Sequence, residues 1–195
     1  MKKKKVLITK SMLQRRIKEL AKQIENDYKG KDLTVICLLK GSIYFTADLT
    51  KYLRKNVIVE CMRLSSYEGT NSTGVIKMKL DLDEPVTGKH ILIVEDIIDT
   101  GRTLSYLVDY LKGEKPASLK ICTLLDKPDR RVVKMTPDYS GFTIPNLFVI
   151  GYGMDYDEKY RNLPAIHCFI SDRDEEKAVL EYQAKIEKML KKWYN

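Results

Sequence analysis

Residues 91–104 read ILIVEDIIDTGRTL, and this stretch decides the fold class. Four branched apolar residues at 91–94 run directly into charged residues, and a Gly-containing turn follows at 100–103. A continuous apolar run bounded by such a turn predicts a strand buried in a parallel sheet. A helical pattern begins after the turn, so the stretch predicts the strand–turn–helix unit of an α/β protein.

The polar residues of this stretch indicate a ligand. Two adjacent carboxylates buried without partners would cost several kcal/mol each, so we expect Glu95 and Asp96 to meet solvent, a cation or a ligand rich in hydroxyl groups. The turn at 100–103 lies at a helix N-terminus, where the helix dipole and unpaired N–H groups favour phosphate. These features together predict a cradle for ribose 5-phosphate. Its residues are Glu95, Asp96, Asp99, Thr100, Gly101, Arg102 and Thr103.

Two well-known nucleotide-binding motifs are absent from the chain, since neither GxxxxGK[ST] nor GxGxxG occurs. A core strand followed by an ordinary acidic loop is the plainer alternative to a cradle. That alternative accounts for 91–94, but it does not account for three acids and TGRT within nine residues.

The length and composition indicate one globular domain. The chain has 195 residues, of which 44% are hydrophobic and 32% are charged, as in a folded protein with a substantial core. No apolar stretch approaches the length of a membrane span, and the apolar run after MKKKK is too short for a signal peptide. The cysteines are widely spaced with no CxxC pair, which is typical of reduced thiols. We therefore expect a cytoplasmic protein without a membrane partner.

Two basic segments account for much of the formal net charge of +8. The lysines at 2–5 lie at a terminus that we expect to be mobile, and four more lysines lie within 185–192. A basic surface can bind nucleic acid, but solvated lysines and a substrate with several phosphates explain the same charge. We therefore do not expect nucleic acid as a partner.

The rest of the chain alternates between helical and strand patterns. Apolar residues at helical spacing predict helices over 11–28, 43–53, 103–112 and 174–193. Short apolar runs predict strands over 33–39, 57–64, 75–80, 91–94, 119–125, 147–150 and 165–170, whereas the Pro-rich stretch 127–145 carries no predicted element. This alternation implies a mostly parallel twisted sheet flanked by helices on both faces, with ligands beyond the carboxyl ends of the strands.

The last predicted helix, 174–193, has one apolar face, acids in its first turn and lysines in its last turns. We expect this face to pack on the domain or on another subunit. The chain is therefore divided into a main domain, 1–172, and an amphipathic C-terminal helix, 173–195, that is part of the same domain or of its interface.

The stretch 91–104 resembles the signature of the type I phosphoribosyltransferases, which bind phosphoribosyl pyrophosphate (PRPP). Further motifs follow in the order of one branch of that family, with LKGS at 39–42, DKP at 126–128, FVIGYGMD at 148–155 and DEKYRNL at 157–163. Over most of its length the chain is thus similar to the 6-oxopurine (hypoxanthine-guanine) phosphoribosyltransferases, in their short bacterial-like form. The resemblance implies the type I phosphoribosyltransferase fold over 1–172, with a small hood, followed here by a C-terminal helical extension.

By this resemblance, two cations and a mobile lid hold the leaving pyrophosphate. The pair KG at 40–41 matches the family's pyrophosphate loop, in which the peptide bond before the lysine can be cis, and the lid spans about 65–74. The implied pyrophosphate-binding residues are Lys40, Gly41, Ser66, Tyr67 and Arg161. Without the resemblance, 40–41 predicts a surface turn and 65–74 a polar hairpin loop.

The resemblance also implies a purine site and a metal site. Lys127 would donate to the exocyclic O6 of the base, which selects a 6-oxo over a 6-amino purine because an ammonium group only donates. Phe148 would stack on the base, and Asp99 is the candidate catalytic acid or base for the purine proton. The implied purine-binding residues are Lys127, Phe148, Val149 and Asp155, and the implied ligands of a Mg²⁺ cofactor are Glu95, Asp96 and Asp155. Taken alone, Lys127 would be a solvated lysine and Phe148 a core aromatic.

The implied activity is transfer of the 5-phosphoribosyl group from PRPP to N9 of hypoxanthine or guanine, which gives IMP or GMP and pyrophosphate, as in purine salvage. A xanthine-preferring phosphoribosyltransferase and a PRPP-sensing regulator that binds nucleic acid remain alternatives. The resemblance also implies a homo-oligomer, either a dimer or a tetramer, although the C-terminal helix extends past the usual end of the short bacterial members.

Overall fold

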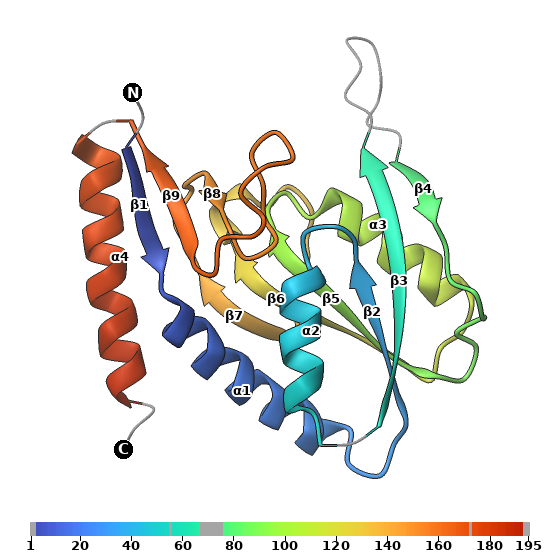
Figure 1. Ribbon diagram of the computed structural model, residues 1–195. Helices are drawn as coiled ribbons and strands as arrows, with labels where there is room; N and C mark the ends of the chain where they lie inside the picture. The colour runs from blue at the N-terminus through green and yellow to red at the C-terminus, as the bar shows by residue number, and fades with distance from the viewer. Residues whose placement is uncertain (1–2, 55, 67–75, 172, 193–195) are drawn as a thin grey trace.

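A computed structural model describes residues 3–54, 56–66, 76–171 and 173–192 (Figure 1). The α-helices are α1 (Lys10–Asp27), α2 (Ile43–Tyr52), α3 (Arg102–Gly113) and α4 (Arg173–Lys192), and a short 3-10 helix spans Pro128–Arg130. The strands are β1 (Lys3–Ile8), β2 (Leu33–Leu38), β3 (Val57–Ser66), β4 (Ile76–Leu80), β5 (His90–Ile98), β6 (Ser118–Asp126), β7 (Tyr139–Thr143), β8 (Val149–Ile150) and β9 (Ile166–Ile170).

Six of the strands form the central sheet, in the order β4-β3-β2-β5-β6-β7. All of its pairings are parallel except the pairing of β4 with β3. Figure 1 shows α1 and α2 on one face of this sheet and α3 on the other. The predicted architecture of a mostly parallel sheet with helices on both faces is confirmed, and the carboxyl ends of β2, β5 and β6 meet at one edge.

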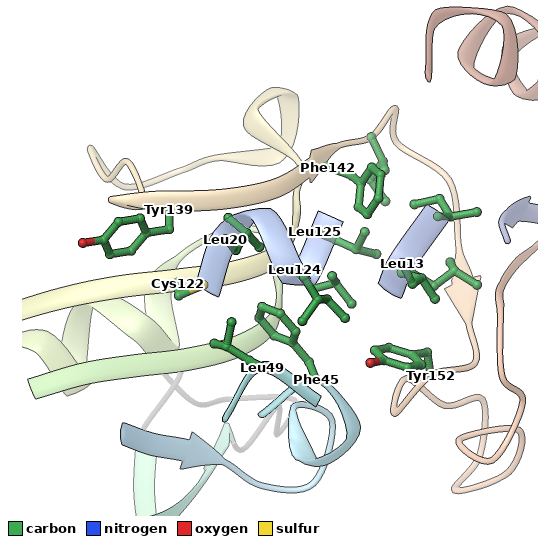
Figure 2. Packing of buried hydrophobic residues seen from close by; sticks show 14 of the residues in the cluster. Leu13, Leu20, Phe45, Leu49, Cys122, Leu124, Leu125, Tyr139, Phe142 and Tyr152 are labelled. Atoms are coloured by element: carbon green, nitrogen blue, oxygen red, sulfur yellow. The ribbon is translucent and has the colours of Figure 1, made fainter. Parts of the chain in front are cut away.

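The apolar half of β5 lies at the centre of the core and serves both helical layers, because successive side chains of a strand point to opposite faces. Leu92 and Val94 belong to the buried cluster that includes α1 and α2, whereas Ile91 and Ile93 belong to the cluster that includes α3. Figure 2 shows part of the first cluster, where side chains of α1 and α2 pack with those of β6 and β7.

Helix α1 follows from capping and periodicity in the sequence. The hydroxyl of Thr9 accepts a hydrogen bond from the backbone N–H of Met12, which satisfies one of the free donors at the helix start. The buried side chains of α1 recur every three or four residues, so one stripe of the helix faces the core. These residues are Leu13, Ile17, Leu20, Ala21 and Ile24.

The lysines at 3–5 belong to strand β1, so the predicted mobile terminus is wrong for these three residues. Strand β1 pairs antiparallel with β9, and β9 pairs with β8, which forms a separate three-stranded sheet that we call the hood. The Nζ atom of Lys4 lies 5.9 Å from the centroid of the Tyr160 ring, and Lys5 forms an ion pair with Glu176 of α4. The run of lysines conceals the strand, because pairing with β9 rather than hydrophobic alternation stabilises it.

Strand β7 lies within 127–145, where no element was predicted. It is an edge strand that pairs only with β6 in the central sheet. Two of its aromatic side chains, Tyr139 and Phe142, are buried in the main core. The surrounding prolines conceal this strand in the sequence, although prolines near an edge strand remove no ladder hydrogen bonds within the sheet.

Two strands extend at least two residues past their predicted carboxyl ends. Strand β5 stays paired with β6 as far as Ile98, so Glu95 and Asp96 lie within the strand rather than beyond its end. Strand β3 pairs with β4 as far as Ser66, so Ser65 and Ser66 are strand residues rather than the start of a loop. The remainder of the predicted lid, 67–74, lies outside the described residues.

Helix α4 runs alongside β1 at the edge of the molecule (Figure 1). Its residues Val179, Tyr182 and Ile186 are buried in the same cluster as α1 and α2. The apolar face predicted for this helix thus packs on the rest of the chain. Among the described residues, no helix is long and apolar enough to span a membrane.

Candidate active site

The carboxyl edge of the central sheet carries a cavity of about 210 Å³ between the ends of β5 and β6 and the hood. Its lining residues are Asp96, Ile97, Asp99, Lys127, Phe148, Val149, Met154 and Asp155. All of them except Ile97 and Met154 are among the site residues predicted from the sequence. The fold thus brings together residues that are up to 59 positions apart, from Asp96 to Asp155.

The loop after β2 closely approaches the acidic end of β5. The peptide bond between Leu39 and Lys40 is cis. A Cβ atom on Gly41 would overlap the carboxylate of Asp96, so a larger residue at this position would force that side chain to move. A Cβ atom on Gly153 would likewise overlap the carbonyl oxygen of Gly41. The predicted pyrophosphate loop, the acid pair and the hood loop are therefore in direct contact.

The environment of Glu95 and Asp96 raises the pKa of both carboxyl groups. Burial raises the pKa of Glu95 well above its ordinary value, and the neighbouring Asp96 raises it further. Burial also raises the pKa of Asp96 to about 6, although the N–H of Ile97 and the guanidinium of Arg161 lower it. Among the described residues, Oε2 of Glu95 is buried without a hydrogen-bond partner. A cation or ligand hydroxyl groups would satisfy this unmet capacity.

The start of α3 lies at the same edge of the sheet. Gly101 precedes the helix with φ 82°, a conformation that glycine adopts without strain. The first turn of a helix has N–H groups without intrahelical partners, so the turn offers donors to a phosphate. The backbone N–H of Val132 donates to the carbonyl oxygen of Thr100 at 3.1 Å, and the side chain of Arg102 is exposed. Segment 131–133 thus supports the turn from the outside.

Lys127 and Asp99 form a pair on the cavity wall. Lys127 is only 6% exposed, in contrast to the solvated lysine that its position alone suggested. Its Nζ lies 3.9 Å from Oδ2 of Asp99, and Nε of Arg130 donates to Oδ1 of Asp99 at 3.1 Å. Burial lowers the pKa of Lys127, and the charge of Asp99 acts in the opposite direction. The pair offers a ligand a buried donor beside a carboxylate acceptor.

The ring of Phe148 is a platform rather than a core side chain, since it is 51% exposed. It stacks on Phe169 with a centroid separation of 6.2 Å and an interplanar angle of 27°, and Tyr156 meets it edge-on. These contacts hold the ring while it lines the cavity. A rigid aromatic ring at a cavity suits a planar ligand.

Lys40 and Arg161 meet through a shared carboxylate. Oε2 of Glu158 lies 2.8 Å from Nζ of Lys40 and 3.4 Å from Nη2 of Arg161. Arg161 also donates to the carbonyl oxygen of Gly153 at 2.7 Å and lies 2.9 Å from Oδ1 of Asp155. The two cations predicted to bind pyrophosphate therefore come to one place beside the acid pair.

Comparison with known sequences identifies the family of this chain. The phosphoribosyl transferase domain profile matches residues 8–157, which is well over half of the chain. The chain belongs to the phosphoribosyltransferase family. The hypoxanthine-guanine phosphoribosyltransferase of Streptococcus pneumoniae is 50% identical over 164 residues, which cover 84% of this chain and 91% of the relative.

Solved structures of phosphoribosyltransferases have the same fold. A crystal structure of a hypoxanthine-guanine phosphoribosyltransferase from Bacillus anthracis has a TM-score of 0.80 at 47% identity, and the match covers 86% of this chain and 97% of that one. A hypoxanthine phosphoribosyl transferase from Trypanosoma cruzi has a TM-score of 0.81 at 45% identity, covering 91% and 95%. The type I phosphoribosyltransferase fold predicted from 91–104 is confirmed.

The acids of this phosphoribosyltransferase fit a magnesium ion. Glu95 and Asp96 provide hard carboxylate oxygens, and one of these has no partner among the described residues. Oδ1 of Asp155 lies 2.9 Å from the guanidinium of Arg161, and Oδ2 accepts a hydrogen bond from the backbone N–H of Glu158 at 2.9 Å. Both oxygens keep lone pairs for a cation. Within the described ranges, no three metal-binding side chains form a ready cage. Mg²⁺ commonly binds through one or two carboxylates together with substrate phosphates and water.

Not every predicted site residue of this phosphoribosyltransferase lines the cavity or lies within the described residues. Glu95 neighbours Asp96 but is not among the lining residues. Ser66 ends β3, and Tyr67 lies outside the described residues.

The residues that the sequence did not reveal are Ile97, Met154, Arg130 and Glu158. The first two look like ordinary core residues. Arg130 and Glu158 look like solvated loop charges, and the only signal for Glu158 is its position three residues before Arg161.

Proposed function

We propose that this phosphoribosyltransferase transfers the 5-phosphoribosyl group of PRPP to N9 of hypoxanthine or guanine, which gives IMP or GMP and pyrophosphate. The observation that carries the proposal is the buried Lys127 beside Asp99, next to the half-exposed ring of Phe148. A buried ammonium group can donate to the O6 atom of a 6-oxopurine but not to the amino group of adenine. The names of the relatives support the same bases.

The reaction breaks the bond between C1 of the ribose and pyrophosphate, so positive charge develops on the sugar and negative charge on the leaving group. Lys40 and Arg161 would stabilise the pyrophosphate, and the N–H groups at the start of α3 would hold the 5-phosphate. Glu95 and Asp96 would bind the ribose hydroxyl groups. Bound Mg²⁺, held by acids among Glu95, Asp96 and Asp155, would add positive charge beside the phosphates.

The base would lie between Phe148 and the cavity wall. Lys127 would donate to O6, the backbone of Val149 would meet the edge of the ring, and Asp155 would complete the base site. Asp99 would exchange the purine proton as N9 forms its bond to the sugar. This assignment separates Glu95 and Asp96, which would hold sugar and metal, from Asp99, which would move a proton.

The direct test follows the ultraviolet absorbance of hypoxanthine, guanine, xanthine and adenine in separate reactions with PRPP and Mg²⁺. We expect turnover with hypoxanthine or guanine, little with adenine, and loss of turnover when a chelator removes the metal. Fastest turnover with xanthine would favour the xanthine-preferring alternative. Absence of turnover with every base, together with salt-sensitive RNA binding, would favour the regulator.

We also propose a homo-oligomeric enzyme of the cytoplasm, with residues 1–172 as the catalytic domain and 173–195 as its C-terminal extension. The cysteines that the structure describes are all free, as in a reducing compartment. The relative from Trypanosoma cruzi comes from a study of the role of its C-terminal region on oligomeric state and enzymatic activity. Light scattering of the full chain and of a chain ending at residue 172 would show whether α4 contributes to assembly.

A further inference from the structure

One acid of the site has no role in the proposed reaction. Glu158 lies in the loop between Asp155 and Arg161, and 118 positions separate it from its partner Lys40. Its Oε2 atom lies 2.8 Å from Nζ of Lys40 and 3.4 Å from Nη2 of Arg161. A single carboxylate oxygen therefore lies between the two cations that pyrophosphate would need.

The backbone of this loop is held in an uncommon conformation. Asp157, Glu158 and Tyr160 have φ values of 52°, 59° and 73°, in the left-handed region that residues other than glycine rarely adopt. Such conformations cluster at functional sites. Oδ2 of Asp155 accepts a hydrogen bond from the backbone N–H of Glu158 at 2.9 Å. The backbone of Glu158 is thus tied to Asp155, a neighbour of Arg161 in the same loop.

Arg161 does not depend on Glu158 for its position. Its guanidinium is anchored at 2.7 Å on the carbonyl oxygen of Gly153 and at 2.9 Å on Asp155. For Lys40, by contrast, Glu158 is the one ion-pair partner within the described part of the chain. The Lys40 ammonium also lowers the pKa of Glu158, as expected for a pair of opposite charges.

We propose that Glu158 is an internal competitor of pyrophosphate, whose carboxylate must leave Lys40 and Arg161 before the pyrophosphate group of PRPP, or the pyrophosphate product, can bind them. This inference rests on the proposed function, since it takes these two cations as the pyrophosphate site. The carboxylate would keep the cations neutralised in the free enzyme, and its return would help to expel the product. If Glu158 competes with pyrophosphate, its removal should strengthen pyrophosphate binding. If Glu158 instead holds the two cations in position for pyrophosphate, its removal should weaken that binding.

The test compares the binding of Mg²⁺-pyrophosphate, by calorimetry, to the wild type and to Glu158→Gln, which removes the charge but keeps the length of the side chain. Asp157→Asn is the matched control, because it removes the same charge from the neighbouring residue, which is 4.0 Å from Lys159 and contacts neither Lys40 nor Arg161. Glu158→Asn is a second variant, because asparagine tolerates positive φ better than most residues.

We expect both Glu158 variants to bind pyrophosphate roughly threefold to tenfold more tightly. The reason is that pyrophosphate would no longer have to displace Glu158 from its two partly exposed ion pairs. Asp157→Asn should change the affinity by less than about twofold. The KM for PRPP should fall in the Glu158 variants, whereas the KM for hypoxanthine should stay unchanged. In a Lys40→Gln background, the effect of Glu158→Gln should shrink.

Unchanged or weaker pyrophosphate binding in the Glu158 variants would overturn the proposal, as would an equal gain in Asp157→Asn. These outcomes are distinct from failure of the proposed function. In that case the wild type itself would form no IMP or GMP from PRPP.

Discussion

The two halves of β5 have opposite effects on the stability of the protein. Residues 91–94 are fully buried and apolar, and they join the clusters on both faces of the sheet. Glu95 and Asp96, one peptide bond further, are acids whose charged forms burial disfavours. The first half stabilises the fold through burial of apolar surface, whereas the second half lowers stability at the proposed binding site. Stability and function are thus separated along one strand.

The largest expected effect lies just beyond the acidic half. Asp99→Asn should lower kcat by about 10²–10⁴-fold, because the amide cannot exchange the purine proton, while the KM for PRPP stays nearly unchanged. Steady-state kinetics with hypoxanthine and PRPP measure both, with Asp129→Asn as the control at an exposed acid. An equal loss of kcat and of PRPP affinity would show that Asp99 binds PRPP rather than moving a proton.

A substitution in the apolar half should act on stability instead. Ile93→Ala removes a fully buried side chain, so the free energy of unfolding should fall by about 2–5 kcal/mol. Urea denaturation measures this change, and the same truncation at the 55% exposed Ile58 should have a much smaller effect. If the folded variant keeps a kcat near that of the wild type, the apolar half acts on stability alone. A large loss of kcat with little loss of stability would break the separation between the two halves.

The next expected effect is on binding of the purine base. Lys127→Ala removes a charged donor, so the KM for hypoxanthine should rise roughly tenfold to a hundredfold and discrimination against adenine should relax. The ratio of kcat/KM for hypoxanthine and adenine measures this, and Lys134→Ala, at an exposed lysine, is the control. If the ratio is unchanged, another group reads position 6 of the purine.

The last expected effect is the pH dependence of stability that comes from the acidic half. Burial raises the pKa of Asp96 in the folded protein from its ordinary 3.8 to about 6. Between these values the folded protein keeps a proton that the unfolded chain has released, so the contribution of Asp96 to stability falls as pH rises and is constant above about pH 6. Urea midpoints of the wild type and Asp96→Asn between pH 4 and 7 measure this. A difference that does not vary with pH would exclude it.

Local sequence predicted the parts of the site that lie next to strands. Asp96, Asp99 and Lys127 follow apolar runs, so the carboxyl edge of a parallel sheet had to bring them together. Glu158 and Arg130 have no such signal, because a charged loop residue looks the same whether it meets solvent or a distant partner. Strand β1 was missed for a related reason, since its partner β9 lies at the other end of the chain.

Residues 91–104 by themselves determined an α/β fold, because a buried strand, a glycine turn and a helix start are local consequences of residue type. The cradle for a phosphorylated sugar that they also indicate stays a prediction. Tertiary structure alone decided that the acid pair is partly desolvated, that Lys127 is buried and that Lys40 and Arg161 share one carboxylate. The physical reason is that burial and charge pairing depend on neighbours brought in from distant positions. A pattern along the chain specifies an element and its buried face, but only packing specifies the electrostatic environment of each charge.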